Sequence, residues 1–257
     1  MEEAQPLALS TPIWIDLGSP DIAASQAFYG GLFGWEGATP DPQYGGYANF
    51  SLNGQSVAGL GPQMGPVSAW ATYVSTEDAG ATAQKVRDAG GQVVMEPMDV
   101  GPFGSMAVFT DPAGAFISTW QPGTHKGAEL YNQPGSFGWN ELATNDMEAA
   151  KRFYQSVFGW DAKVSEVPGF GNYTEWQLSG RSIGGGMEMG DSFPPGVPPH
   201  WLVYFMVADC DQTVQKAEEL GGAVLSPAMD MSAGRFAVLR DQHGAAFAVI
   251  QVPSQTT

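Results

Sequence analysis

The stretch WIDLGSPDIAASQAFYGGLFGW, residues 14–35, decides the fold, because it returns without a gap as WNELATNDMEAAKRFYQSVFGW at residues 139–160. Both copies begin with tryptophan, carry a Phe-Tyr pair and end in Phe-Gly-Trp. Self-similarity over such a length is the mark of an internal repeat. The chain is therefore expected to consist of two homologous halves.

The match extends along most of the chain. Residues 47–59 correspond to 173–185, residues 70–91 to 201–222, and residues 107–122 to 237–253. The segment between the halves is rich in proline and glycine, which is typical of a linker. We therefore predict a first domain at 8–122, a linker at 123–135 and a second domain at 136–253.

Each half is predicted to hold two β-α-β-β-β modules. The first helix of each half should begin after a capping residue, Ser19 or Asn145, and should end at Gly34 or Gly159. Alternating runs after each helix, separated by turn pairs such as Asn53-Gly54, predict antiparallel strands. The expected fold class is α+β, with four modules in two domains whose curved, mostly antiparallel sheets surround a cleft.

Composition limits the partners of the chain. Its 257 residues include 27 acidic and only 10 basic residues, for a net charge of −17. Such a charge repels phosphates, so we expect neither nucleic acid nor an anionic membrane as a partner. The acidic start of the chain and the lack of a long apolar run predict a cytoplasmic protein. Both a monomer and a homodimer remain open.

The four modules resemble the vicinal oxygen chelate superfamily, which includes glyoxalase I, extradiol dioxygenases and bleomycin-resistance proteins. The resemblance rests on the "FY…FGW" helix of each half, which reads LFGW at the end of the first copy, and on the "DPAG" turn before the last strand of the first half, and it covers about residues 11–253. It is strongest to tandem glyoxalase/bleomycin-resistance proteins of actinomycete type, some of which are labelled hydroxylases. One scaffold of this kind hosts unrelated chemistries, so the fold alone does not set the function.

The resemblance also implies where metal ligands would lie in metal-dependent members. Counting from the helix and turn aspartates gives Trp14, Trp139, Ser118 and Ala248, and the strand before the second helix of each half gives Ala71 and Leu202. Divalent metals need imidazole, carboxylate or thiolate ligands, and none of these side chains supplies one. We therefore expect neither a metal nor another cofactor.

The histidines and the cysteine give no strong signal for a site. His125, His200 and His243 are scattered and form no pair at ligand spacing. Cys210 is the only cysteine, so a disulfide within the chain is impossible. It lies at a helix start but has no histidine partner nearby in the sequence, which argues against a nucleophile.

Asp16 and Glu141 are the most informative charges. Each lies two residues after a tryptophan, Trp14 or Trp139, and residues i and i+2 of a strand share a face. In an apolar pocket such a carboxylate would act as a base or as a hydrogen-bond acceptor. The alternative interpretation is a structural carboxylate that accepts backbone N–H groups.

Aromatic side chains are the candidate ligand contacts, because broad π-faces suit a flat apolar molecule. The candidates are Trp14, Tyr47, Trp70, Tyr73 and Trp120 in the first half, and Trp139, Tyr173, Trp176, Trp201 and Tyr204 in the second.

These patterns lead to two hypotheses of function. The first is metal-independent binding or sequestration of a planar, hydrophobic aromatic small molecule, an antibiotic or a biosynthetic intermediate, by a protein that serves resistance or works beside a partner biosynthetic enzyme. The alternative is a glyoxalase-like lyase, or a tailoring enzyme of the hydroxylase or isomerase type, that uses Asp16 or Glu141.

Overall fold

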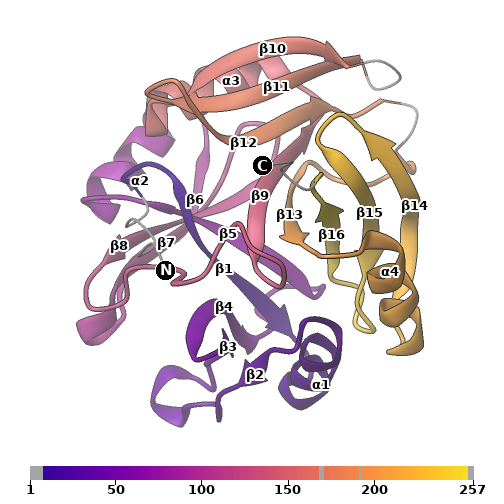
Figure 1. Cartoon of the computed structure of the whole chain (residues 1–257). Helices are drawn as coiled ribbons and strands as arrows, with labels where there is room; N and C mark the ends of the chain where they lie inside the picture. The colour runs from indigo at the N-terminus through magenta and orange to yellow at the C-terminus, as the bar shows by residue number, and fades with distance from the viewer. Residues whose placement is uncertain (1–7, 168–170, 191–192, 254–257) are drawn as a thin grey trace. The chain divides into compact units, whose positions relative to one another are not determined.

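The computed structural model describes residues 8–167, 171–190 and 193–253 (Figure 1). Four β-α-β-β-β modules follow one another along the chain, as the sequence predicts. The elements of the first half are β1 (Pro12–Ser19), α1 (Ile22–Phe33), β2 (Glu36–Gly37), β3 (Ala48–Leu52), β4 (Gln55–Pro62), β5 (Ala69–Ser75), α2 (Ala79–Asp88), β6 (Gln92–Asp99), β7 (Gly104–Thr110) and β8 (Phe116–Pro122). Those of the second half are β9 (Phe137–Thr144), α3 (Met147–Phe158), β10 (Asp161–Val167), β11 (Gly171–Leu178), β12 (Arg181–Glu188), β13 (His200–Met206), α4 (Cys210–Glu219), β14 (Ala223–Met231), β15 (Gly234–Arg240) and β16 (Ala246–Gln251).

The strands form two eight-stranded sheets, one from each half of the sequence. Their orders are β2-β3-β4-β1-β5-β8-β7-β6 and β10-β11-β12-β9-β13-β16-β15-β14. The last three strands of a module pair antiparallel in chain order, whereas the first strand lies parallel to the last, as β1 does to β4 and β9 to β12. The α+β class and the modular order predicted from the sequence are confirmed.

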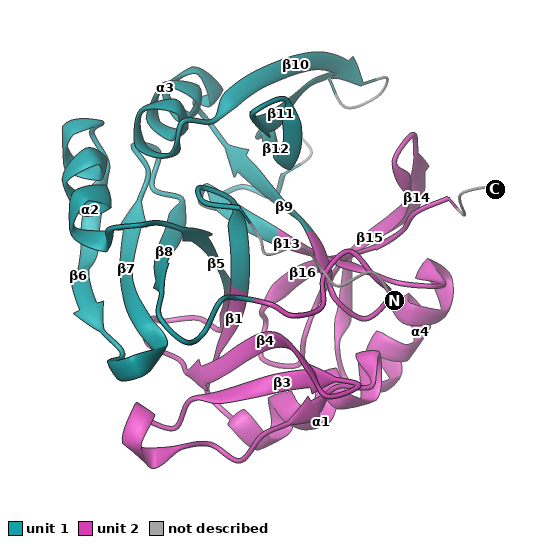
Figure 2. Ribbon diagram, turned by 60° about the vertical axis from the view of Figure 1, so that its left-hand side comes forward, with its two compact units in different colours: residues 1–14, 71–127, 139–202 teal, residues 15–70, 128–138, 203–257 magenta. Residues whose placement is uncertain are grey.

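The structure divides into two compact units that do not coincide with the two halves of the sequence. Unit 1 contains residues 1–14, 71–127 and 139–202, and unit 2 contains residues 15–70, 128–138 and 203–257 (Figure 2). Each unit thus combines one module of each half: the second with the third, and the first with the fourth. The division into domains at 8–122 and 136–253 stays a prediction from the sequence.

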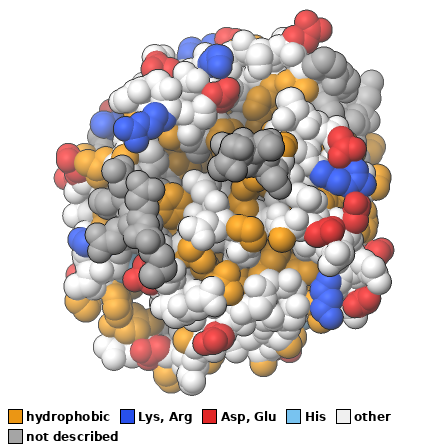
Figure 3. Space-filling model, viewed as in Figure 1, with side chains coloured by type: hydrophobic (Ala, Val, Ile, Leu, Met, Phe, Trp, Pro, Cys, Tyr) orange, Lys and Arg blue, Asp and Glu red, His pale blue; other side chains and the backbone are white. Residues whose placement is uncertain are grey.

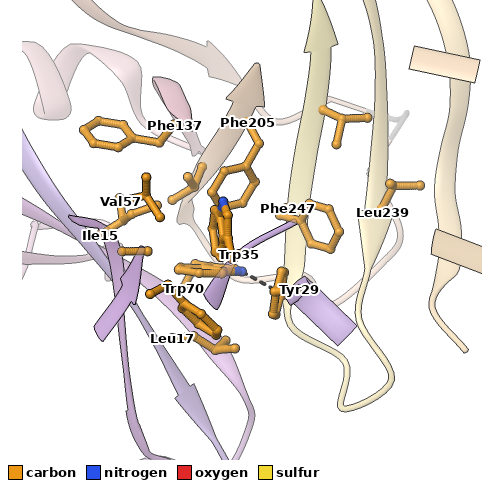
Figure 4. Packing of buried hydrophobic residues seen from close by; sticks show 14 of the residues in the cluster. Ile15, Leu17, Tyr29, Trp35, Val57, Trp70, Phe137, Phe205, Leu239 and Phe247 are labelled. Carbon is orange, nitrogen blue, oxygen red and sulfur yellow. Dashed lines mark hydrogen bonds between the residues drawn. The ribbon is translucent and has the colours of Figure 1, made fainter. Parts of the chain in front are cut away.

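Each unit has its own hydrophobic core, built on the helix-facing side of its strands. In unit 2 the helices α1 and α4 pack together, and alternate residues of β1 such as Ile15 and Leu17 are buried with Phe205 and Phe247 (Figure 4). In unit 1 the helices α2 and α3 pack together over a core that includes Phe109. Because strand side chains alternate, the residues between these core positions point to the opposite face.

The helix ends differ in part from the prediction. The N-cap of α1 is Asp21 and that of α3 is Asp146, in place of Ser19 and Asn145. Each aspartate accepts a hydrogen bond from the backbone N–H three residues later, the usual capping geometry. The hydroxyl of Ser19 instead bonds to the backbone of Asp21, so it supports the cap from outside the helix.

The helix C-termini agree with the sequence. Gly34 and Gly159 end α1 and α3 with φ values of 74° and 75°, a conformation that glycine adopts without strain. None of the helices in the described part of the chain is long and apolar enough to span a membrane. On the face in Figure 3, acidic and basic side chains lie interspersed, and no basic patch gathers there.

Candidate ligand-binding site

The face of β9 that points away from the core of unit 1 carries two of the predicted site residues. Leu142 is buried in that core, whereas its neighbour Glu141 and, two residues earlier, Trp139 lie on the other face and are partly exposed. The prediction that residues i and i+2 of this strand share a face is therefore correct for Trp139 and Glu141. A partly exposed indole and a partly exposed carboxylate lie side by side on one strand.

Tyr173 on β11 joins these two side chains in a hydrogen-bonded chain. The Trp139 Nε1–H donates to the Tyr173 hydroxyl at 3.0 Å, and that hydroxyl donates to Glu141 Oε2 at 2.8 Å. The phenol thus serves as acceptor and donor at once. All three groups belong to unit 1, so one compact body fixes their geometry.

A glycine lets the phenol lie against the sheet. Gly185 on β12 pairs in register with Glu141 on β9, and a Cβ at that position would collide with the Tyr173 hydroxyl. The sequence analysis did not identify this glycine as part of the site. Its signal was present, since Gly185 aligns with Gly59 at the end of a repeated segment.

The electrostatics of the pair keep the phenol protonated. Burial, followed by the negative charge of Glu141, raises the pKa of the Tyr173 hydroxyl well above its ordinary value of 10.0. Tyr173 is therefore a fixed hydrogen-bond donor to the carboxylate. The Glu141 carboxylate is in turn fixed as the acceptor of this bond.

The first half of the sequence contains an equivalent carboxylate–tyrosine pair, which lies in unit 2. The Tyr47 hydroxyl donates to Asp16 Oδ2 at 3.2 Å. Gly59 on β4 pairs in register with Asp16, and a Cβ there would collide with the Tyr47 hydroxyl. The same arrangement has thus been kept in both halves, with Asp in one and Glu in the other.

The remaining aromatic candidates fall into two groups. Trp70, Trp176 and Trp201 lie in the hydrophobic cores, where Trp70 Nε1 donates to the Tyr29 hydroxyl and Trp201 Nε1 to the Tyr154 hydroxyl. These three indoles are therefore on the core side of their strands. The other candidates, Trp14, Tyr73, Trp120 and Tyr204, are also largely buried but belong to neither core cluster.

The positions implied for a metal do not fit one. They hold Trp14, Trp139, Ser118, Ala248, Ala71 and Leu202, which provide indole, hydroxyl and hydrocarbon groups. A divalent ion needs three or four imidazole, carboxylate or thiolate ligands that converge. Within residues 8–167, 171–190 and 193–253, no group of three or more His, Cys, Asp or Glu side chains is placed to hold one.

His200, His243 and Cys210 lie on elements other than those that carry the carboxylate–tyrosine pairs. His243 is in the turn between β15 and β16, and His200 begins β13 and packs near Phe193. Cys210 is buried at the start of α4, and burial raises the pKa of its thiol to about 11. A thiol of this kind is a poor nucleophile at neutral pH.

The profile of the Glyoxalase/Bleomycin resistance protein/Dioxygenase superfamily matches residues 12–119 and 136–249. The chain therefore belongs to this superfamily, with one domain match in each half. This result confirms the family resemblance seen in the repeated motifs.

Two kinds of relative are similar over nearly the whole chain. The anthracycline biosynthesis protein DnrV of Streptomyces peucetius is 42% identical over 95% of this chain and 94% of its own length. The putative glyoxylase CFP32 of Mycobacterium bovis is 41% identical over 95% of this chain and 96% of its own length.

Solved structures share the fold at low sequence identity. The Mn(II)-bound glyoxalase from Novosphingobium aromaticivorans has a TM-score of 0.66 at 15% identity, with 95% of this chain and 82% of that chain covered. The 2,3-dioxygenase LapB from Pseudomonas sp. KL28 also has a TM-score of 0.66, at 12% identity, with 98% and 96% covered. At such identities the likeness establishes the fold and nothing about the chemistry.

Proposed function

We propose that the protein binds a planar aromatic small molecule without a metal and acts in the biosynthesis or tailoring of an aromatic natural product. One observation carries the proposal: in both halves a tyrosine hydroxyl donates to a carboxylate over a glycine, on strands β1 and β9. Such a pair presents a fixed acceptor beside aromatic surface. It suits a flat ligand whose edge carries hydroxyl groups.

The recognition would combine stacking with charge-assisted hydrogen bonding. The indole of Trp139 offers a π-face, and a stacked ring contributes about 0.5–1.5 kcal/mol beyond its buried area. Glu141 accepts from Tyr173 and would also accept from a phenolic hydroxyl of the ligand. A hydrogen bond to a charged group contributes about 1.5–3 kcal/mol. The polar contact therefore selects among ligands that stack equally well.

The relatives support the class of ligand. Two of them, from Streptomyces peucetius and Streptomyces sp. (strain C5), are named anthracycline biosynthesis proteins and are each 42% identical to this chain. Anthracyclines are planar fused-ring molecules with phenolic hydroxyls, the kind of ligand that the carboxylate–tyrosine pairs favour. We propose a ligand of this chemical class, held for a partner enzyme or sequestered from the cell.

A binding experiment with matched probes tests the proposal. The full chain is titrated by calorimetry with 2,6-dihydroxyanthraquinone, whose hydroxyls lie on the edge of the rings away from the quinone carbonyls, and with anthraquinone, which has the same rings without the hydroxyls. We expect saturable binding of both, with the dihydroxy compound favoured at least about tenfold, because one hydrogen bond to a charged acceptor contributes about 1.5–3 kcal/mol.

The variants identify the acceptor. Glu141→Gln and Tyr173→Phe should reduce the preference for the dihydroxy compound, while Glu148→Gln, which changes an exposed carboxylate on α3, should leave it intact. If no planar aromatic compound with phenolic hydroxyls binds saturably, the proposal is wrong.

A second function rests on the name of another relative. The putative glyoxylase CFP32 is 41% identical to this chain, which favours a lyase in which Asp16 or Glu141 acts as a base.

The two functions differ in what happens to the bound compound. Mass spectrometry of the probe after incubation separates them: an unchanged compound supports binding, and a product that disappears in Glu141→Gln or Asp16→Asn supports the enzyme. Elemental analysis of the purified protein completes the comparison, because stoichiometric zinc, nickel or iron would support the enzyme.

A further inference from the structure

The segment that follows β8 folds back onto unit 1 and is held there by its backbone. The N–H groups of Gly123 and His125 donate to the carbonyl of Phe103 at 2.8 and 3.2 Å, and Thr124 N–H donates to the carbonyl of Pro102 at 2.8 Å. A Cβ at Gly123 would come within 2.5 Å of the Pro102 carbonyl oxygen, so the segment lies tight against this turn. The position of His125 is thus fixed by main-chain bonds that do not involve its imidazole.

The imidazole of His125 packs between two of the tryptophans proposed as ligand contacts. Its centroid lies 4.4 Å from that of Trp14 at an interplanar angle of 83°, and 5.5 Å from that of Trp120 at 67°. The Trp120 Nε1–H also donates to the His125 carbonyl at 2.9 Å. Trp14 is left 3% exposed and Trp120 6%. An aromatic ring of the chain itself therefore occupies the place where a ligand ring would contact Trp14.

The corresponding tryptophan of the second half is in a different situation. Trp139 lies in the same compact unit as Trp14 and occupies the equivalent position of the repeat. It remains partly exposed, and its Nε1–H is turned to Tyr173. Within unit 1, therefore, one of the two equivalent indoles is covered by an internal ring and the other is accessible.

We infer that Trp139 marks the working ligand site of this chain, and that the equivalent position at Trp14 is filled by His125 of the linker. The identity of the ligand in this inference rests on the proposed function. The difference in exposure between Trp14 and Trp139 does not depend on it. It predicts one ligand per chain, bound through the second half, although both halves carry a carboxylate–tyrosine pair.

A ligand-independent experiment tests the difference in access. Hydroxyl-radical footprinting of the native full chain, read by peptide mass spectrometry, should oxidise Trp139 faster than Trp14. His125→Ala should raise the oxidation of Trp14 several-fold, because the backbone bonds keep the linker in place while the covering ring is gone. Lys126→Ala, at the exposed next residue, should not change it. Equal oxidation of the two indoles in the native chain, or no response of Trp14 to His125→Ala, would overturn the inference.

Binding stoichiometry gives the second test. Calorimetry with 2,6-dihydroxyanthraquinone should give one site per native chain and a second site in His125→Ala. Trp139→Leu, which removes the π-face, should weaken the native event about two- to tenfold, the contribution of one stacked ring, while Trp14→Leu should leave it unchanged. Two equal sites in the native chain would overturn the inference and leave the proposed function intact. A complete lack of binding would overturn the proposed function, and the footprinting result would then decide the inference by itself.

Discussion

The hydroxyl of Tyr29 on α1 donates a hydrogen bond of 3.1 Å to Asp241, which lies 212 residues later in the turn before β16. Both groups are buried in unit 2, and the Trp70 Nε1–H donates to the same hydroxyl at 3.0 Å. This contact ties the first module to the fourth. The Phe-Tyr pair of the helix and the Asp-x-x-Gly turn therefore recur in the sequence because one docks onto the other.

Unit 1 contains the same arrangement in Tyr154, Asp111 and Trp201. The Tyr154 hydroxyl donates to Asp111 Oδ2 at 3.1 Å and accepts from Trp201 Nε1 at 2.8 Å. Tyr154→Phe leaves a buried carboxylate oxygen and a buried indole N–H without this partner. We expect a loss of about 1–3 kcal/mol in the free energy of unfolding, measured in urea.

A double-mutant cycle isolates the interaction. Asp111→Asn is combined with Tyr154→Phe, and the second substitution should cost less when the first is present, because the two groups act together. If the two losses simply add, the hydrogen bond does not carry the stability that we assign to it.

The sequence revealed the modules but not this contact. Repeated segments show which parts of the chain are alike, and they carry no signal for which module packs on which. The contact between Tyr154 and Asp111 joins the third module to the second, and it depends on tertiary packing that no local pattern records. The N-caps were missed for a related reason: Ser19 and Asp21 are both good capping residues, and only the helix entry decides between them.

The placement of the candidate site residues on strand faces was predicted in part. The i, i+2 rule correctly placed Trp139 and Glu141 on one face of a strand. Other candidates were chosen by residue type alone, although Trp201 and Tyr204 are three residues apart on β13 and must therefore point to opposite faces. The same holds for Trp70 and Tyr73, and for Tyr173 and Trp176. In each pair one member is in a core, so strict use of the strand period would have separated them.

The glycine beneath Tyr173 gives a prediction about the geometry of the site. In Gly185→Ala the added methyl would collide with the tyrosine hydroxyl, so the phenol must move away from the position in which it donates to Glu141. We expect the preference for 2,6-dihydroxyanthraquinone over anthraquinone to be lost. The matched control is Gly190→Ala, where no atom lies within 4 Å of the added methyl. Retention of the preference in Gly185→Ala would show that the pair does not recognise the ligand.

Cys210 gives a prediction about reactivity. Its thiol is buried, and burial together with the neighbouring charge of Asp211 raises its pKa to about 11. The thiolate is the reactive form, so we expect very slow modification by a disulfide reagent at about pH 8 in the native chain and fast modification in urea. Rapid labelling of the native chain would contradict a structural role for this thiol.

The pH dependence of Tyr173 tests the electrostatics of the candidate site. Burial and the charge of Glu141 hold the pKa of its hydroxyl above 10.0, so the folded state keeps a proton that the unfolded chain loses. The stability that this group contributes is therefore present below about pH 10 and decreases as the pH rises above it. Urea unfolding at several alkaline pH values should show a steeper loss of unfolding free energy in the native chain than in Tyr173→Phe.

Nuclear magnetic resonance of ring-labelled tyrosine, assigned with Tyr173→Phe, measures the ionisation directly. It should show Tyr173 ionising at a higher pH than ordinary tyrosines. Glu141→Gln should lower the pKa of Tyr173, because the negative charge that helps to raise it is removed. An ordinary pKa that does not respond to Glu141→Gln would mean that the phenol and the carboxylate are not paired in solution, and the acceptor proposed for the ligand would then be lost with the pair.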